Sequence, residues 1–387
     1  MSKKITFLWD NFGPLHIDRI EAVAKHFKAQ REVVGLEICG KSDVYDWRTG
    51  DVGAFQHKTL FEDKDLRNLK VWPLFKALIK STRRDGQADY MFCHWNEPAV
   101  FLAACWLRLK GCRVFTMGCS KFDDKPRKAR TEFLKSIMFL PYSGALGSGY
   151  RSTDYFRFLG IPKSKVAGEY NTVSLDRIRK QAGLGPFSEA QEEEGPSFQE
   201  RGFLCVARLV EKKNLFNLIK AYSLYHHAAQ NPRKLHICGS GPLEEKLKET
   251  VRRLGLQNDV EFHGFLQTED ISRMMLLSLS LVLPSYEEQF GNVVPEAQAF
   301  GLPVLISDNA GARDFLVQSG RTGFVVEPNN IEGMAYFMTC LARNEEDWKR
   351  LRRATFEIAP TGDVASFAQG VERLIGESIN QANGSAR

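Results

Sequence analysis

The stretch YEEQFGNVVPEAQAFGLPVLIS (286–307) indicates how this chain folds. An apolar run, SLVLPS (280–285), precedes it and predicts a buried strand, and its own last residues, PVLIS, predict the next one. Between the two, Asn292 is a favoured N-cap residue, and the apolar spacing over 293–300 predicts one short helix. Gly301 stands where a left-handed glycine commonly ends a helix. The stretch therefore predicts a strand–loop–helix–strand unit of an α/β protein.

The same alternation of strand-like and helix-like runs extends in both directions and predicts two Rossmann-like domains with parallel sheets. Strands are expected at 5–9, 33–39, 89–95, 113–117, 202–208, 234–239 and 260–264, and helices at 17–27, 99–110, 215–228 and 242–255. Because ligands bind beyond the carboxyl ends of such strands, a cleft between the two domains is the expected site.

One segment interrupts the alternation. PFSEAQEEEGPSFQE (186–200) has five Glu, two Pro and no Lys or Arg, which is the composition of a solvated linker. We therefore predict an N-terminal domain over 1–185, an acidic linker over 186–200 and a C-terminal domain over 201–362. A C-terminal helix and tail (363–387) could pack back onto the N-terminal domain.

Bulk properties limit the classes of protein. The 387 residues are more than one hydrophobic core usually spans, and a net charge of +6 suits an anionic substrate or lipid surface without requiring nucleic acid. The N-terminal apolar run is too short for a signal peptide, and no run approaches the ~18 apolar residues of a spanning helix. The eight cysteines form no C-x-x-C pair, so we expect reduced thiols in a cytoplasmic protein.

Two acids flank the predicted helix start. Glu288 lies in the loop and Glu296 lies one turn inside the helix, beside backbone N–H groups that suit an anion. The spacing of eight residues is by itself weak evidence for a functional pair, because Glu192 and Glu200 are also eight residues apart. Carboxylates cannot bind an anion, but they accept hydrogen bonds from hydroxyl groups. We interpret both acids as hydroxyl acceptors for a ligand whose anionic part lies elsewhere.

Cations for that anionic part follow the predicted strand GFLCVAR. Arg208 ends this strand and Lys213 lies five residues on, and each could give a phosphate charge-assisted hydrogen bonds of about 1.5–3 kcal/mol. The alternative is a solvated helix start. Gly239 and Gly241 form another strand–turn–helix, which is equally typical of a tight turn. His263 is more typical of a strand end than of a catalyst.

Four motifs together resemble a known family. RLVEKKN (208–214), CGSGPLE (238–244), VEFHG (260–264) and EQFGNVVPEAQAFGLPV (288–304) resemble, in order and spacing, the retaining family 4 (group 1) glycosyltransferases. The resemblance is strong over about 200–330 and looser over 1–185. It implies a GT-B fold, in which two Rossmann-like domains with parallel sheets face each other across a cleft.

The resemblance also implies roles for individual residues. The donor would be a nucleoside-diphosphate sugar, UDP- or GDP-linked, with no cofactor and no divalent metal. Arg208 and Lys213 would hold its diphosphate, Glu288 would bind the sugar at the reacting centre, and Glu296 would bind the ribose. Further donor contacts would come from Gly239, Gly241, Phe265, Leu266 and the backbone amides of Phe290, Gly291 and Asn292.

In the first half, the loop DNFGPLHIDR (10–19) would bring Gly13 close to the diphosphate, and His16 could meet donor or acceptor. His94 ends the predicted strand ADYMFCHW and is placed with His16 and Glu288 among the catalytic candidates. Candidate acceptor contacts follow at Trp95, Asn96 and Glu97. Where the family often carries a histidine near the reacting carbon, this chain has Gly118, so another group, or the leaving diphosphate itself, would take the acceptor proton.

The stretch KFDDKPRKARTEFLKSIMF (121–139) combines six Lys or Arg with several large apolar residues. As a basic amphipathic helix it could contact an anionic membrane, which would place the protein at the inner face; an ordinary solvated helix is the alternative. Together these features predict a retaining glycosyltransferase that acts on a glycan or a lipid-linked acceptor in polysaccharide or glycoconjugate biosynthesis. The alternatives are a GT-B epimerase or phosphorylase, and a non-catalytic nucleotide-sugar-binding subunit.

Overall fold

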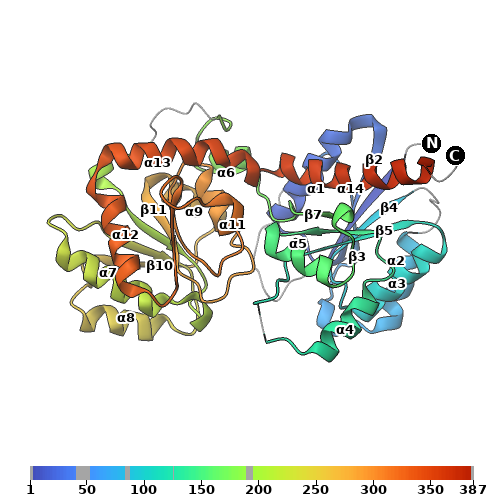
Figure 1. Cartoon of the computed structure of the whole chain (residues 1–387), viewed down its shortest axis with the longest axis horizontal. Coiled ribbons are helices and arrows are strands. Elements are labelled where there is room, and N and C mark those ends of the chain that lie inside the picture. The colour runs from blue at the N-terminus through green and yellow to red at the C-terminus, as the bar shows by residue number, and fades with distance from the viewer. Residues whose placement is uncertain (1–2, 41–52, 83–87, 125, 189–194, 385–387) are drawn as a thin grey trace. The chain divides into compact units, whose positions relative to one another are not determined.

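A computed structural model describes residues 3–40, 53–82, 88–124, 126–188 and 195–384. The chain forms two compact units, shown in Figure 1. Unit 1 comprises Met1–Thr172 together with Val364–Arg387, and unit 2 comprises Val173–Asp363. Each unit is built on one sheet, and all the strand pairs between the named strands are parallel. The prediction of two parallel-sheet α/β domains is confirmed.

Unit 1 has a seven-stranded sheet in the order β3-β2-β1-β4-β5-β6-β7. Its strands are β1 (Lys3–Trp9), β2 (Arg31–Cys39), β3 (Gln56–Phe61), β4 (Asp89–Phe92), β5 (Arg113–Gly118), β6 (Gly144–Gly147) and β7 (Val166–Ala167). Its helices are α1 (Pro14–Phe27), α2 (Val71–Ser81), α3 (Pro98–Leu109), α4 (Ala129–Met138), α5 (Gly149–Phe158) and α14 (Val364–Gly384). Two apolar cores, one against α2 and α3 and the other against α1 and α14, cover the two faces of the sheet.

Unit 2 has a six-stranded sheet in the order β10-β9-β8-β11-β12-β13. Its strands are β8 (Gly202–Val206), β9 (Leu235–Cys238), β10 (Val260–Gly264), β11 (Ser278–Leu283), β12 (Val304–Ser307) and β13 (Gly323–Val326). Its helices are α6 (Leu175–Gln181), α7 (Leu215–Ala228), α8 (Glu244–Arg253), α9 (Thr268–Leu277), α10 (Val293–Gln298), α11 (Arg313–Leu316), α12 (Ile331–Arg343) and α13 (Glu345–Ile358). Strands such as β11 are buried throughout, as expected for a sheet covered on both faces.

Each sheet has a point at which the strand order reverses. In unit 1 it lies between β1 and β4, and in unit 2 between β8 and β11. In open α/β sheets, ligands bind outside the carboxyl ends of the strands at this point. The predicted site residues that follow β1, β4, β8 and β11 therefore lie where each sheet is built to receive a ligand.

The division of the chain differs from the predicted boundaries. Residues 173–185 belong to unit 2, because Arg179 of α6 is buried there and donates to the Ala299 carbonyl at 3.1 Å. The segment 186–200 consequently lies inside unit 2 rather than between the units, and its residues 189–194 lie outside the described part of the chain. Its end is anchored, since Phe198 is buried against Trp348 with ring centroids 5.4 Å apart.

The last helix, α14, belongs to unit 1. In Figure 1 it runs beside α1, and the two helices are in extensive contact. The buried side chains Phe367, Val371 and Ile375 join the same core as Ile17 and Ile20 of α1. A helix at the end of the sequence thus closes one face of the sheet that the first residues begin.

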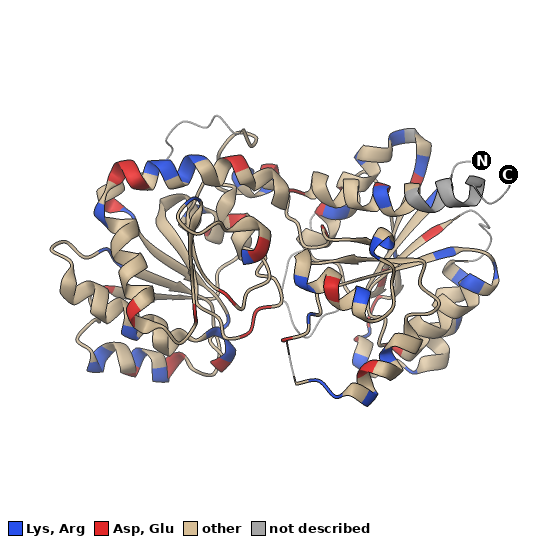
Figure 2. Ribbon diagram, in the orientation of Figure 1, with Lys and Arg blue, Asp and Glu red and all other residues tan. Residues whose placement is uncertain are grey.

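One predicted helix is shorter than expected. Among the described residues of 121–139 only α4 (Ala129–Met138) is helical, because Arg127 holds the residues before it in a loop by donating to Tyr155 and to the Phe122 carbonyl. Elements that the sequence pattern did not identify include β3, β6, β7, β13, α2, α5, α6, α9, α11, α12 and α13. No helix among the described residues is long and apolar enough to cross a membrane. Figure 2 shows Lys and Arg interspersed with Asp and Glu over the helices of both units.

Candidate active site

In unit 2 the loops that follow the strands are tied to one another in a continuous row, which we call the carboxyl rim. The rim comprises residues 207–214, 239–243, 264–267, 284–292 and 308–312. Hydrogen bonds from Gly239 N to Gly264 O (2.7 Å) and from Leu209 N to Ser240 O (2.9 Å) connect the loops after β8, β9 and β10. Tyr286 N donates to Lys212 O (2.8 Å) and so joins the loop after β11 to that after β8. Most of the predicted donor residues lie on this rim.

Lys213 and Glu288 form an ion pair across the reversal point, between the loops after β8 and β11. Only 14% and 17% of their side chains are exposed. The sequence interpretation gave the two residues separate roles, phosphate binding and sugar binding, and did not anticipate their contact. The roles remain compatible, because an ammonium group has three donors and can hold Glu288 and a phosphate oxygen together.

Asn214, which the sequence interpretation missed, fixes Lys213 in place. It adopts a left-handed conformation (φ 58°), which Asn tolerates better than most residues, and it is 3% exposed. Its Nδ2 donates to the carbonyls of Pro284 (3.0 Å) and Pro328 (2.6 Å), after β11 and β13. The final Asn of RLVEKKN was the available signal, since its position between a turn and α7 requires such a conformation.

Gly239 and Gly241 are required by packing between rim loops. A Cβ on Gly239 (φ 136°) would lie 1.9 Å from Ala207 O, and one on Gly241 would lie 2.5 Å from Leu209 O. The tight-turn interpretation therefore accounts for both glycines. A role in donor binding remains a prediction for the backbone that they allow.

The helix start in the opening stretch differs from its predicted form. Asn292 has helical angles and makes no capping hydrogen bond, and α10 has only six residues. Asn292 therefore stands in the predicted N-cap position without capping the helix, and α10, with its six residues, gives little helix dipole. Asn292 Oδ1 is instead a buried acceptor without a hydrogen-bond partner among the described residues. Gly291 (φ 103°) turns the chain beside Glu288, whose Cγ would lie 3.4 Å from a Cβ there.

Other parts of the stretch follow the prediction. Gly301 has φ 63°, and the hydrogen bond from Leu302 N to Ala297 O (3.2 Å) closes the helix end in the predicted way. Phe290 is buried against Phe315, so its backbone is its available contact with a ligand. Glu296 is partly buried on α10.

Two further predicted donor residues are exposed on the rim. Arg208 makes no side-chain hydrogen bond or ion pair with any residue that the structure describes. Phe265 is 53% exposed directly after Gly264, and Leu266 is partly buried. An unpaired cation and an exposed aromatic ring on one rim suit a ligand that has both an anionic and a flat part.

In unit 1, Gly13 and His16 shape the loop after β1. Gly13 precedes α1, whose first residue is Pro14, and its N–H donates to His16 Nδ1 at 3.1 Å. Burial, with a smaller contribution from the positive charge of Arg19, lowers the pKa of His16 to about 3, although Asp10 opposes the shift. His16 is therefore a partly buried, neutral imidazole at physiological pH.

His94 follows β4, which ends two residues earlier, and has a left-handed backbone (φ 57°). Its Nε2 lies 3.2 Å from Asp10 N and 3.1 Å from Asp10 Oδ1, so it joins the β1 and β4 loops at the reversal point. Burial raises the pKa of Asp10, but the hydrogen bond and charge of His94 outweigh this effect and the pKa lies below its ordinary value. A His–carboxylate pair at this position can hold or move a proton.

Arg19 is a second residue that the sequence interpretation missed. It is 2% exposed, lies over the Tyr170 ring (5.2 Å to the centroid) and donates through Nε to Thr172 O at 3.1 Å. Tyr170 in turn accepts from Trp9 Nε1 at 2.8 Å. An arginine within the apolar stripe of the first helix was the available signal.

The predicted acceptor residues have mixed environments. Trp95 is partly buried, with its ring 4.9 Å from that of Phe139, so it packs against the core. Asn96 is exposed, and Glu97 precedes α3 with its N–H bonded to His94 O (2.9 Å). At Gly118, which ends β5, a Cβ would meet only Phe156, at 3.5 Å. Its lack of a side chain is therefore not a steric requirement.

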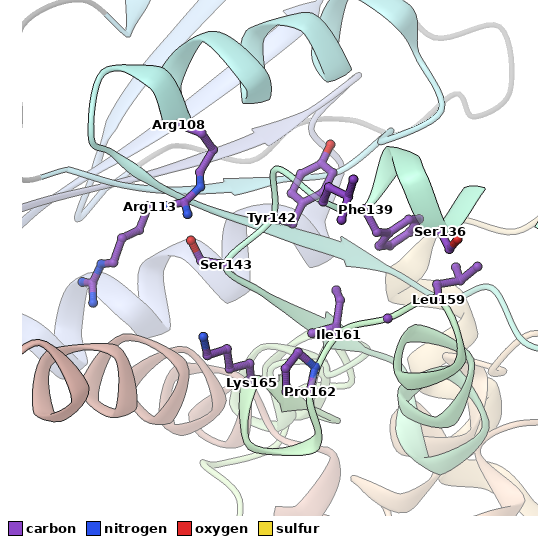
Figure 3. A pocket seen from close by; sticks show the side chains of 12 residues that line it. Arg108, Arg113, Ser136, Phe139, Tyr142, Ser143, Leu159, Ile161, Pro162 and Lys165 are labelled. Atoms are coloured by element: carbon purple, nitrogen blue, oxygen red, sulfur yellow. The ribbon is translucent and has the colours of Figure 1, made fainter. Parts of the chain in front are cut away.

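Unit 1 also contains a cavity of about 480 Å³, shown in Figure 3. Arg113, Ser143 and Lys165, which line it, stand at or just before the amino ends of β5, β6 and β7. It therefore lies at the opposite edge of the sheet from His94. Arg113 is held there by Asp89, with Nε 2.6 Å from Oδ1.

Comparison with known proteins shows what the chain is similar to. Residues 187–357 match the family described as glycosyl transferases group 1. The poly(glycerol-phosphate) alpha-glucosyltransferase of Bacillus subtilis is 33% identical over 158 residues, which are 40% of this chain and 23% of that protein. The putative glycosyltransferase EpsD of the same organism is 29% identical over 275 residues, 68% of each chain. The chain spans less than half the length of the first curated relatives that it matches.

Two solved structures are similar over the whole fold. Anabaena HepE in complex with UDP and glucose has a TM-score of 0.69 at 16% identity, covering 97% of this chain and 100% of that one. The sucrose-phosphate synthase of Thermosynechococcus elongatus has a TM-score of 0.69 at 16% identity, covering 99% and 100%. These likenesses confirm the GT-B fold of two Rossmann-like domains.

Proposed function

We propose that the protein is a retaining glycosyltransferase that moves a sugar from a nucleoside-diphosphate sugar to a hydroxyl group of a glycan or lipid-linked acceptor. The observation that carries this proposal is the Lys213–Glu288 ion pair at the reversal point of unit 2, with Arg208 on the same rim and without a side-chain partner in the described part of the chain. The pair offers a cation for a phosphate and a carboxylate for hydroxyl groups side by side. Support also comes from the family match over 187–357 and from the UDP and glucose named with the HepE structure.

In the proposed donor complex, Arg208 and Lys213 bind the diphosphate and Phe265 contacts the base. Glu288 accepts from sugar hydroxyls, and Glu296 accepts from those of the ribose. The charges supplied by Arg and Lys neutralise the leaving diphosphate without a divalent ion. Addition of Mg²⁺ or Mn²⁺ should therefore leave the transfer rate unchanged.

On the acceptor side, the proposal assigns proton handling to His94 and its partner Asp10, or to the leaving diphosphate. His16, neutral at physiological pH, would serve as a hydrogen-bonding group rather than as a cation. Gly118 leaves this chain without the histidine that the resembled family often carries. A His94→Gln variant should lose transfer to acceptor while it keeps nucleotide affinity.

A membrane-facing acceptor is supported by the surface of α4. Phe133, Leu134, Ile137 and Leu140 are exposed, the last at 78%, near Lys128 and Arg130. Apolar side chains among basic ones favour contact with an anionic lipid surface. Sedimentation with vesicles should show binding to anionic and not to neutral lipid, and a Phe133→Ser/Leu134→Ser variant should lose it.

The test of the activity begins with the base. A panel of UDP, GDP, ADP and CMP is screened for a rise in melting temperature, since a ligand of the folded state stabilises it. The matching donors are then incubated with and without acceptors and followed by NMR. A new glycoside with the anomeric configuration of the donor supports the proposal. Inversion contradicts retention, an epimerised free sugar supports an epimerase, and nucleotide binding without turnover supports a binding subunit.

A further inference from the structure

Three potential metal ligands lie together on the edge of the unit 2 sheet. His236 is on β9, and Glu261 and His263 are on β10, the outermost strand. Glu261 pairs directly with His236 in the strand register. The register then shifts between Phe262 and Gly264, so His263 stands at a bulge. Bulges re-aim side chains, and this one accompanies the approach of His263 to the other two.

The distances within the cluster are those of a coordination shell. His236 Nδ1 lies 3.0 Å from His263 Nε2 and 3.3 Å from Glu261 Oε2, and His263 Nε2 lies 3.8 Å from the same oxygen. A metal–ligand distance of about 2.05 Å separates neighbouring ligand atoms of a tetrahedral site by about 3.3 Å. The three observed separations bracket this value, so a small ion could be bound with slight side-chain adjustment.

The surroundings leave the cluster accessible and orient it. Phe262 packs against the apolar core, so its neighbours on β10 point to the opposite face of the sheet. The three ligand side chains are 21–39% exposed. Lys234 Nζ lies 2.5 Å from Glu261 Oε1, which directs the other oxygen toward the histidines. Gly202 of β8 leaves room for the His236 ring, whose Nε2 would lie 3.0 Å from a Cβ there.

We propose that His236, Glu261 and His263 bind one divalent ion of the Zn²⁺ class. Two imidazoles and one carboxylate form the ligand set that such ions prefer, and the exposed side leaves a fourth position for water. The ion would join the edge strand β10 to β9 and hold the strand end that precedes Phe265. This site is separate from the proposed donor site and does not depend on the proposed activity.

The alternative is a hydrogen-bonded ladder without an ion. The lysine–carboxylate pair and the two rings would then serve to protect a sheet edge, as charged groups often do. Co²⁺ distinguishes the alternatives. Bound at a tetrahedral site, the ion absorbs visible light intensely, whereas a hydrogen-bonded ladder does not bind the ion.

The test uses the untagged, chelator-treated protein titrated with CoCl₂ and then with ZnCl₂. We expect one Co²⁺ per chain, intense visible bands without the near-ultraviolet band of a thiolate ligand, displacement by Zn²⁺, and a higher melting temperature with either ion. The thiolate band matters because the chain has eight free cysteines. Absence of the visible bands, or the presence of a thiolate band, would overturn the proposal.

Variants assign the ligands. His236→Asn, Glu261→Gln and His263→Gln should each weaken Co²⁺ binding by at least ~10-fold, the lower end of what loss of even an outer-shell partner costs. The matched control replaces His226 and His227, another histidine pair of unit 2, by alanine and should bind like the wild type. Circular dichroism establishes that each variant is folded. Wild-type affinity in a folded His236→Asn/His263→Gln variant would also overturn the proposal.

Discussion

Lys213 and Glu288 contact each other, so neither residue can be replaced without affecting the other. Removal of one partner leaves a mostly buried charge unpaired. Lys213→Met and Glu288→Gln should each lower the free energy of unfolding by about 1–3 kcal/mol, and the double variant should lose less than their sum. Urea denaturation measures this coupling. Strict additivity would show that the pair is not formed in solution.

The same two variants separate stability from chemistry. If both side chains contact the donor, each single variant should lose transfer by about 100-fold or more, the cost of removing one charge-stabilising group at the reacting centre. The double variant should be no more active than either single variant, although it is more stable than the summed losses of the two single variants predict. Near-wild-type turnover in any of the three would contradict the donor assignment.

Phe265 is exposed and its loss should not affect folding. Phe265→Ala should raise the Kd for the preferred nucleotide by about 5- to 150-fold, which corresponds to the ~1–3 kcal/mol of a base stacked on an aromatic ring. Tyr336→Ala, which removes another exposed aromatic ring of unit 2, on α12, is the control. Calorimetric titration measures both. An unchanged Kd in Phe265→Ala would remove this residue from the proposed base contact.

His16 should make stability depend on pH. The unfolded chain takes up a proton below the ordinary histidine pKa of 6.5, whereas the folded protein does not until about pH 3. The stability that neutral His16 gives the folded protein is therefore fully present above pH 6.5. As the pH falls below this value, the free energy of unfolding decreases by up to about 1.4 kcal/mol per pH unit.

Urea denaturation between pH 7 and pH 5 should show this loss in the wild type and a smaller one in His16→Gln. Equal slopes in the wild type and in His16→Gln would show that His16 is not buried as a neutral group.

At the scale of elements, rim loops such as those after β8 and β9 are positioned by backbone packing at glycines. Gly239→Ala should cost about 1–3 kcal/mol more than Gly255→Ala, because both have a positive φ but only Gly239 would place a Cβ against a carbonyl. Thermal unfolding compares the two. Equal losses would mean that the loop shifts without cost and that close packing does not require the glycine.

The sequence predicted elements well where they are apolar and regular. The strand and helix of 280–301 were found because burial on both faces leaves continuous apolar runs, and Gly301 marks the helix end. Short strands such as β6, GALG, carry almost no pattern and were not identified. In the site, residue types predicted Lys213 and Glu288, but their contact depends on how two loops 75 residues apart pack, which no local pattern records. Arg19 could have been noticed from its place in the apolar stripe of α1, but its partners, residues 170 and 172, could not be predicted from local sequence.

At the scale of the whole molecule, unit 2 is inserted between the parts of unit 1. A chain that ends at Asp363 lacks Phe367, Val371 and Ile375, so one face of the unit 1 sheet is exposed. We expect the truncated protein to lose the cooperative unfolding of unit 1. A fragment of residues 173–363 should still unfold cooperatively and bind nucleotide. Calorimetry and limited proteolysis show whether each of these two proteins is cooperatively folded. A folded unit 1 without α14 would contradict this account.

The place of α14 also bears on how the chain folds as it is synthesised. The ribosome makes the strands of unit 1 before unit 2, yet it makes the helix that covers one face of their sheet only after unit 2. All of unit 2 emerges in between and can fold on its own, including the pairing of Val173 with Asp363. Unit 1 therefore begins to be synthesised before unit 2 but can complete its fold only after it. Until α14 is made, the apolar face of the unit 1 sheet is exposed unless a chaperone covers it.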